Sequence, residues 1–261
     1  MDRQTLKMHE RDMQKISVKQ KIGKVIVLVL IYAFLIFMAI AVLFPFYWML
    51  NSSLKSLDEY RMSITTFWPK QVLFSNYSTA FTTANLGRLF LNTLYVGLVS
   101  TILSLVITVL SAFAFARLEF KGKNILFAGL LATMMIPGEL FTITNYITVS
   151  NLGWKNTYTV LIVPFLVSVF YIYLLRQNFL QIPNELYLAA KVDGTSDIKY
   201  LWKVMIPMCK PTMITIGILK VIECWNSYVW PRLITDDENY YLVSNGIQEI
   251  RENGFGRENI P

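Results

Sequence analysis

Few residues of this chain could take part in catalysis. Its single histidine, His9, lies in a charged N-terminal stretch, and its two cysteines, Cys209 and Cys224, lie in one apolar stretch. These residues cannot be assembled into a metal site or a histidine-dependent catalytic arrangement. The sequence also has no GxxxxGK[ST] phosphate-binding loop. We therefore expect no catalytic residue, no metal site and no cofactor in this chain.

Two charged residues lie inside the same apolar stretch as the cysteines. Lys220 and Glu223 are three residues apart, so on a helix they share a face and can form an ion pair. Charged groups within a membrane usually face the bundle interior or a water-filled path. Two interpretations stay open here, a transport pathway and a structural ion pair that locks two helices together.

The most polar interior segment of the chain is Gln181–Pro211, which lies between two strongly apolar stretches. A first helix is expected over Asn184–Asp193, with Asn184 as its N-cap. Gly194 can adopt a positive φ and end that helix. A second helix is expected from Asp197 to Met205, capped by Thr195 or Ser196, before Pro207 and Pro211 mark the entry to the next apolar stretch.

The elements that would position these residues are membrane helices. Of the 261 residues, 54% are apolar, and the mean hydropathy is +0.45. A helix needs about 20 apolar residues to cross a hydrocarbon core of about 30 Å. Five continuous apolar runs are long enough, which excludes membrane β-strands. They are approximately Val25–Leu50, Leu91–Ala116, Ile125–Val149, Tyr158–Leu175 and Pro207–Trp230.

The distribution of basic residues predicts how these spans are oriented. Of the 24 Lys and Arg residues, 15 lie in residues 1–24, 117–123 and 176–210, which five spans place on one side. The positive-inside rule makes that side cytoplasmic. We therefore expect a cytoplasmic N-terminal segment at 1–24, a cytoplasmic loop at 176–210 and an extracellular tail at 231–261. The same scattering of charge argues against nucleic-acid binding.

The loop around Gly194 resembles the EAA motif of ABC importer permeases. The family pattern is EAA, three residues, Gly, nine residues and I-x-L-P. Here Leu188-Ala189-Ala190 precedes Gly194 by the same spacing, and Val204-Met205-Ile206-Pro207 follows it by the same spacing. Leu188 departs from the motif, because it stands where the family has a glutamate. Glu185 lies one helical turn earlier on the same face.

Other elements narrow the resemblance to the maltose-type carbohydrate permeases. They are Pro137-Gly138 in the third span and Trp225-Asn226-Ser227-Tyr228 in the fifth. The resemblance implies an all-α integral membrane protein, a polytopic helical bundle with the type I ABC importer permease fold. The permease domain would cover residues 25–261. The family has six helices, so five spans are present here and a sixth is expected beyond the C-terminus.

The resemblance also implies function and partners. The chain would be a non-enzymatic permease subunit of a sugar or oligosaccharide importer in a bacterial plasma membrane, in contact with membrane lipids. Expected partners are a second homologous permease that forms a heterodimer, an extracellular solute-binding protein and two ABC ATPase subunits that bind ATP and Mg. The implied ATPase-coupling residues are Glu185, Leu186, Leu188, Ala189, Ala190, Asp193, Gly194 and Pro207.

A sugar needs hydrogen-bonding groups and aromatic faces along its path. The candidate translocation residues are Asn145, Lys220, Glu223, Asn226 and Tyr228. Two alternatives remain. A permease for a polyamine or glycerol phosphate would keep the EAA loop but leave Lys220 and Glu223 unpaired. A secondary carrier or a membrane enzyme would need an inverted repeat or a catalytic carboxylate pair, and neither is found in the sequence.

Overall fold

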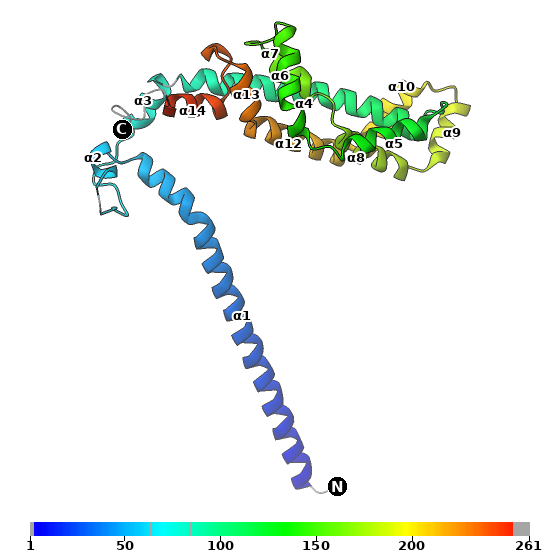
Figure 1. Ribbon diagram of the computed structural model, residues 1–261. Coiled ribbons are helices and arrows are strands. Elements are labelled where there is room, and N and C mark those ends of the chain that lie inside the picture. The colour runs from blue at the N-terminus through cyan, green and yellow to red at the C-terminus, as the bar shows by residue number, and fades with distance from the viewer. Residues whose placement is uncertain (1–2, 63, 84, 253–261) are drawn as a thin grey trace. The chain divides into compact units, whose positions relative to one another are not determined.

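The computed structural model describes residues 3–62, 64–83 and 85–252, with side chains for 23–62, 64–82 and 85–248 (Figure 1). Across this part of the chain the regular structure is helical, and no strand is present. The chain divides into two compact units, Met1–Ser78 and Thr79–Ile260. An all-α fold, as predicted, is therefore found in both units.

The first unit is built on one long helix, α1 (Arg3–Ser53), followed by the short helix α2 (Leu57–Tyr60). The apolar part of α1, Gly23–Ser53, is long and hydrophobic enough to cross a membrane. This range contains the predicted first span. The predicted segment 1–24 continues the same helix from Arg3 onward.

A polar loop closes the first unit. The buried carboxylate of Glu59 accepts hydrogen bonds from the Thr66 hydroxyl at 2.5 Å and from the Lys70 backbone N–H at 3.0 Å. The Thr66 contact in particular holds the pKa of Glu59 below its usual value. Helix α3 (Ser75–Thr83) follows this loop.

The second unit is organised along helix α4 (Leu86–Arg117), against which α8 (Val169–Gln181) and α12 (Lys210–Asn226) pack (Figure 1). Small side chains such as Ala112 and Ala116 on α4 allow this close approach. The core lies between the three helices and includes Leu175, Phe179, Leu201 and Met205. We call the two ends of this unit the α9 end, where Arg117 lies, and the α14 end.

The predicted third span is broken in two. Helix α5 (Lys123–Thr133) ends before Pro137-Gly138, and the chain continues through η1 (Gly138–Phe141) into α6 (Thr142–Asn151) at an angle of 85°. Pro137 cannot donate a helical hydrogen bond, so a break here was expected. The sequence did not predict the size of the bend, and neither half alone is long enough to span a membrane.

The fourth and fifth predicted spans are bent too. Helix α7 (Tyr158–Ile162) and η2 (Val163–Phe165) meet α8 at 48°. At the α9 end, α10 (Asp197–Tyr200), η3 (Leu201–Met205) and α11 (Ile206–Met208) run continuously and meet α12 at 80°. The expected stop at Met205 is therefore wrong. Two helices, α1 and α4, could span a membrane by themselves, and up to five spans are present if each bent pair counts as one.

The predicted extracellular tail is folded onto α4 as far as it is described. Helix α12 ends at Asn226, and α13 (Val229–Ile234), η4 (Glu238–Tyr240) and α14 (Val243–Glu252) follow. Asn92 of α4 donates to the carbonyls of Asn239 and Tyr241 at 2.9 Å each. The fifth span was thus predicted too long, because Trp230 lies in α13. Residues 253–261 lie outside the described residues.

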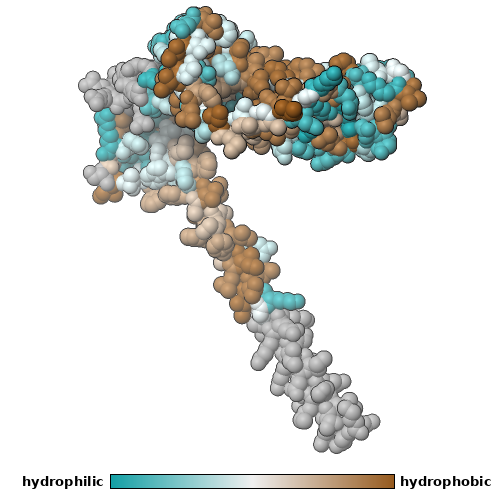
Figure 2. Space-filling view, turned by 45° about the vertical axis from the view of Figure 1, so that its right-hand side comes forward, coloured by the Kyte–Doolittle hydropathy of each residue, from teal (hydrophilic) through white to brown (hydrophobic). Residues whose placement is uncertain are grey.

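Apolar and polar side chains are distributed unevenly over the surface of the second unit. Figure 2 shows hydrophobic side chains over its middle, and hydrophilic side chains are more frequent toward the α9 end. Apolar side chains of α12, such as Ile214, Ile218 and Ile222, are at least half exposed. An exposed apolar middle next to a more polar end is typical of a protein that spans a membrane.

Candidate coupling helix and translocation pathway

The buried guanidinium of Arg117 joins three elements at the α9 end. Its Nη2 donates to the carbonyl of Phe179 at 2.9 Å and to that of Ile182 at 2.6 Å. Its Nη1 donates to Asn184 Oδ1 at 3.2 Å. The carbonyls at a helix C-terminus lack intrahelical donors and attract a cation. Arg117 therefore connects the end of α4 to the end of α8 and to the start of α9 (Asn184–Val192).

A proline separates α8 from α9. Ile182 is extended, with φ −70° and ψ 128°, because the ring of Pro183 disfavours helical geometry in the preceding residue. Pro183 occupies the N-cap position of α9. The predicted N-cap, Asn184, is instead the first helical residue, and its side chain accepts from Arg117. That assignment was wrong because the tertiary contact takes the side-chain oxygen.

The predicted turn at Gly194 is present. Gly194 has φ +72°, and the N–H groups of Gly194 and Thr195 donate to the carbonyls of Lys191 at 3.0 Å and Ala190 at 2.8 Å. This left-handed geometry closes the C-terminus of α9 without strain only for glycine. Ser196 then caps α10 by accepting from the N–H of Lys199.

An aspartate holds the two helices of this turn together. Asp197 Oδ1 accepts from Lys191 Nζ and from the Tyr187 hydroxyl, each at 2.7 Å. The Lys191 contact, with that of Tyr187, holds the pKa of Asp197 below its usual value. The same contact raises the pKa of Lys191. Both groups are therefore charged across the physiological range, and α9 is tied to α10 there.

Helix α9 has one face against the core and one exposed face. Tyr187 and Ala190 are half-buried and pack against the core between α4, α8 and α12. Glu185, Leu188 and Ala189 are exposed on the other face. Ala190 was predicted to contact an ATPase subunit, but it packs against the core and lies away from the exposed face of α9.

Two residues of this region were not predicted from the sequence to take part in it, Val192 and Arg117. Val192 is 88% exposed and lies one turn after Leu188, on the same face. The i, i+4 spacing from Leu188 could have identified it. Arg117 was counted only as a basic loop residue, and its role depends on partners more than 60 residues away in the sequence.

The other predicted coupling residues are dispersed. Leu186 and Asp193 are exposed at the edge of the α9 face. Gly194 shapes the turn, as described above. Pro207 is exposed in α11, outside α9. Their contact with an ATPase stays a prediction.

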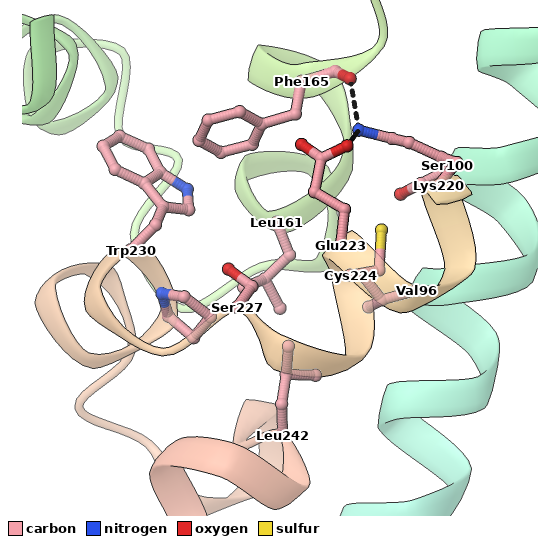
Figure 3. Close-up of a pocket in the computed structure, with 11 residues that line it drawn as sticks. Val96, Ser100, Leu161, Phe165, Lys220, Glu223, Cys224, Ser227, Trp230 and Leu242 are labelled. Atoms are coloured by element: carbon pink, nitrogen blue, oxygen red, sulfur yellow. Dashed lines mark hydrogen bonds and ion pairs between the residues drawn. The ribbon is translucent and has the colours of Figure 1, made fainter. Parts of the chain in front are cut away.

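The charged pair of the fifth span lies beside a small cavity of about 70 Å³ between α4, α7 and α12 (Figure 3). Lys220 Nζ donates to Glu223 Oε2 at 3.2 Å and to the carbonyl of Phe165 at 2.9 Å. Lys220 is buried, whereas the side chain of Glu223 is half exposed. The predicted ion pair is therefore present.

The break in the fourth span explains the second partner of Lys220. The helix stops at Phe165 and restarts at Val169, with Ser168 capping the new helix. The Phe165 carbonyl therefore lacks its helical donor, and the lysine ammonium takes that place. The Tyr171 hydroxyl donates to Glu223 at 3.3 Å, which joins α8 to α12 as well. This arrangement fits the structural-lock interpretation better than a free charge in a pathway.

The remaining pathway candidates are not gathered around this cavity. Asn226 is exposed at the end of α12, and Tyr228 is 38% exposed at the break before α13. Asn145 is half-buried on α6. Instead, the cavity is lined by apolar and small groups that include Trp230, Leu161 and Ser227. The described residues contain no cluster of three or more His, Cys, Asp or Glu side chains that could hold a metal ion.

We expect the Asp197→Asn substitution to loosen α9 from α10. Amide hydrogen exchange in α9 should become faster, while Asp193→Asn on the exposed side should leave it unchanged.

The pH dependence of this contact follows from the lowered pKa of Asp197. A carboxyl with a lowered folded-state pKa contributes stability above its ordinary value of 3.8 and loses it as the pH falls through the folded pKa. After correction for the pH dependence of intrinsic amide exchange, the protection of the α9 amides in the wild type should thus be constant between pH 5 and 8. A marked change within that window would contradict the assignment.

The Lys220→Met substitution should destabilise the protein more than Glu223→Gln does. The methionine leaves a buried carbonyl unpaired, which costs about 1–3 kcal/mol. The glutamine keeps an oxygen that can accept from Lys220 and Tyr171. Thermal unfolding in detergent measures the difference, with exposed Lys121→Met as the control for losing a lysine. Equal losses for Lys220→Met and Lys121→Met would show that the lock contributes nothing.

Comparison with known proteins places the chain in a family. Residues 104–253 match the family model described as "Binding-protein-dependent transport system inner membrane component". A diacetylchitobiose uptake system permease protein of Streptomyces coelicolor is 30% identical, over 83% of this chain and 72% of that protein. An sn-glycerol-3-phosphate transport system permease protein of Pectobacterium atrosepticum is 28% identical, over 83% of this chain and 79% of that protein.

A solved structure has the same fold. It is the crystal structure of a bacterial ABC transporter involved in the import of the acidic polysaccharide alginate. One of its chains aligns with a TM-score of 0.79 and 23% identity, covering 86% of this chain and 80% of that chain. The type I importer permease fold predicted from the sequence is thus confirmed, and this chain belongs to the family of inner-membrane permease components of binding-protein-dependent ABC transport systems.

Proposed function

We propose that this chain forms one half of the membrane pore of a sugar or oligosaccharide importer. A second, homologous permease supplies the other half as a heterodimer. An extracellular solute-binding protein delivers the sugar, and two ATPase subunits bind ATP and Mg and carry out hydrolysis. The permease itself is not an enzyme. The names of similar proteins, which include a disaccharide uptake permease, support the sugar assignment.

Helix α9 is the proposed docking element for one ATPase subunit. The observation that carries this proposal is its exposed face, where Leu188 is 55% and Val192 88% exposed beside the small Ala189. An apolar, exposed face with polar groups at its rim suits a groove on a partner protein. Glu185 and Asp193 would supply the rim contacts.

The rest of the second unit would transmit the motion of α9. The opposite face of α9 is packed on the core. Arg117 joins the start of α9 to α4 and α8, and Asp197 joins the later part of α9 to α10. A push on α9 would therefore move these helices together. Alternating access would follow from the rocking of one permease half against the other.

The α9 end is proposed to face the cytoplasm, together with the N-terminus. The excess of Lys and Arg in residues 1–24, 117–123 and 176–210 supports this orientation. The α14 end would then face the extracellular side, where residues 231–252 can meet the binding protein. Both placements follow from charge, which sets topology in short loops.

An uncharged solute fits the chemistry of the second unit better than an anionic one. Lys220 is the basic residue that lines the cavity described above, and its ammonium group already contacts the Phe165 carbonyl and Glu223. A permease for glycerol phosphate or a polyamine would need an unpaired charge along its path. The cavity of about 70 Å³ is also too small for a sugar ring, so the sugar site would lie on the partner permease or between the two chains.

The Ala189→Arg substitution should remove the ATPase subunit that docks on α9, because a long charged side chain cannot enter a groove that accepts alanine. Co-purification with the partner permease in detergent measures it. Ala80→Arg, the same change at an exposed position on α3, is the control and should retain the ATPase. Loss of the ATPase in both variants, or in neither, would contradict docking through α9.

The solute class is tested in the reconstituted transporter. Binding protein loaded with a neutral oligosaccharide should stimulate ATP hydrolysis severalfold over unloaded binding protein. sn-Glycerol 3-phosphate and a polyamine serve as comparison solutes and should give no stimulation. Stimulation by glycerol 3-phosphate or the polyamine alone would replace the sugar assignment while leaving the coupling helix in place.

A further inference from the structure

The segment Asp197–Met208, which we call the elbow, contains α10, η3 and α11 and meets α12 at 80°. If α12 crosses the bilayer, an element at nearly a right angle to it lies close to the membrane plane. The bend follows Pro207 and falls at Cys209, immediately before Lys210 and Pro211. The elbow is thus placed where a spanning helix leaves the hydrocarbon.

The elbow carries apolar side chains both on the side that packs on the core and on the exposed side. Tyr200, Leu201 and Met205 are fully buried and fill the core. On the opposite side, Ile198 and Trp202 are 56% and 62% exposed and lie four residues apart, so they form one row.

A row of lysines runs beside this apolar row. Lys199 and Lys203 are four residues apart and exposed, and Lys210 is exposed just past the bend, near the half-exposed Met208. Within the described part of the chain, the structure gives none of these three ammonium groups an acidic partner. The acidic residue of the elbow, Asp197, is taken by Lys191 and Tyr187 of α9.

We propose that the elbow is an interfacial segment that binds anionic phospholipid headgroups of the cytoplasmic leaflet. A tryptophan beside aliphatic side chains suits the boundary between headgroups and acyl chains. Lysines lay their stems along such a surface and hold their ammonium groups among anionic headgroups. The orientation rests on the proposed function, which places the α9 end in the cytoplasm.

The contact has a consequence for coupling. Asp197 is the first residue of the elbow and also the residue that ties α9 to it. Seating the elbow in the headgroup layer therefore fixes the depth at which α9 is presented. An anionic leaflet would hold α9 in place for its partner.

The test uses the assembled transporter in nanodiscs of equal parts phosphatidylcholine and phosphatidylglycerol, with one of the two lipids brominated near the glycerol backbone. Bromine quenches nearby tryptophans. The difference between wild type and Trp202→Phe isolates Trp202, and the buried Trp230→Phe provides a control at the α14 end. We expect Trp202 to be quenched by both lipids, and more strongly by the brominated phosphatidylglycerol.

The triple variant Lys199→Gln, Lys203→Gln, Lys210→Gln should lose this preference for phosphatidylglycerol and retain quenching by phosphatidylcholine. Lys121→Gln, an exposed lysine elsewhere at the α9 end, should keep the preference. Absence of Trp202 quenching, or equal quenching by the two lipids in the wild type, would overturn the proposal.

The competing occupant is the ATPase subunit. The triple variant should still co-purify with the ATPase in detergent, where Ala189→Arg should not. If the triple variant loses the ATPase there, or if the ATPase shields Trp202 from bromine, the lysine row contacts protein and the lipid assignment fails. If Trp202 is unquenched while Ala189→Arg still loses the ATPase, the inference falls and the proposed function stands.

Discussion

The buried guanidinium of Arg117 is the interaction on which the α9 end depends. Among the residues whose side chains are described, no carboxylate forms an ion pair with it, and its partners are the carbonyls of Phe179 and Ile182 and the side chain of Asn184. A buried cation without hydrogen bonds would be strongly unfavourable, as would an unpaired Ile182 carbonyl just past the end of α8. The hydrogen bonds of its two terminal nitrogens join the end of α4, the end of α8 and the start of α9. Asp197, the first residue of the elbow, connects these helices to the elbow through its contacts with Lys191 and Tyr187 of α9.

A second polar contact, between Lys220 and the Phe165 carbonyl, joins helices in the middle of the second unit. The helix break after Phe165 leaves the Phe165 carbonyl without a helical donor, and Lys220 of α12 donates a hydrogen bond to it. Inside a membrane a broken helix is tolerated only where other protein groups replace the missing hydrogen bonds. Arg117 and Lys220 thus convert two helix interruptions into connections between helices. The helices of the second unit can therefore be bent and still be joined to one another.

Local chemistry made part of this structure predictable. Gly194, Ser196 and Pro183 each act on their immediate neighbours, so the turn, the cap and the start of α9 follow from their types and spacing, and Pro137-Gly138 marks the break in the third span. The partners of Arg117, the inward face of Ala190 and the angle at Cys209 depend on which helices meet, and no local pattern encodes them. The i, i+3 spacing predicted the Lys220–Glu223 pair, but the Phe165 carbonyl could not be foreseen.

We expect α9 to move as one rigid piece with α4 when the ATPase subunits close. The most direct measurement is a spin-label distance between Leu186→Cys, at the edge of the α9 face, and Arg88→Cys at the far end of α4, in the assembled transporter with Cys209 and Cys224 replaced by alanine. Both labelled positions are exposed in the second unit. The account predicts the same distance distribution without nucleotide and with ATP bound to a hydrolysis-deficient ATPase. A shift or a second population on ATP binding would show that α9 moves independently of α4, and would contradict it.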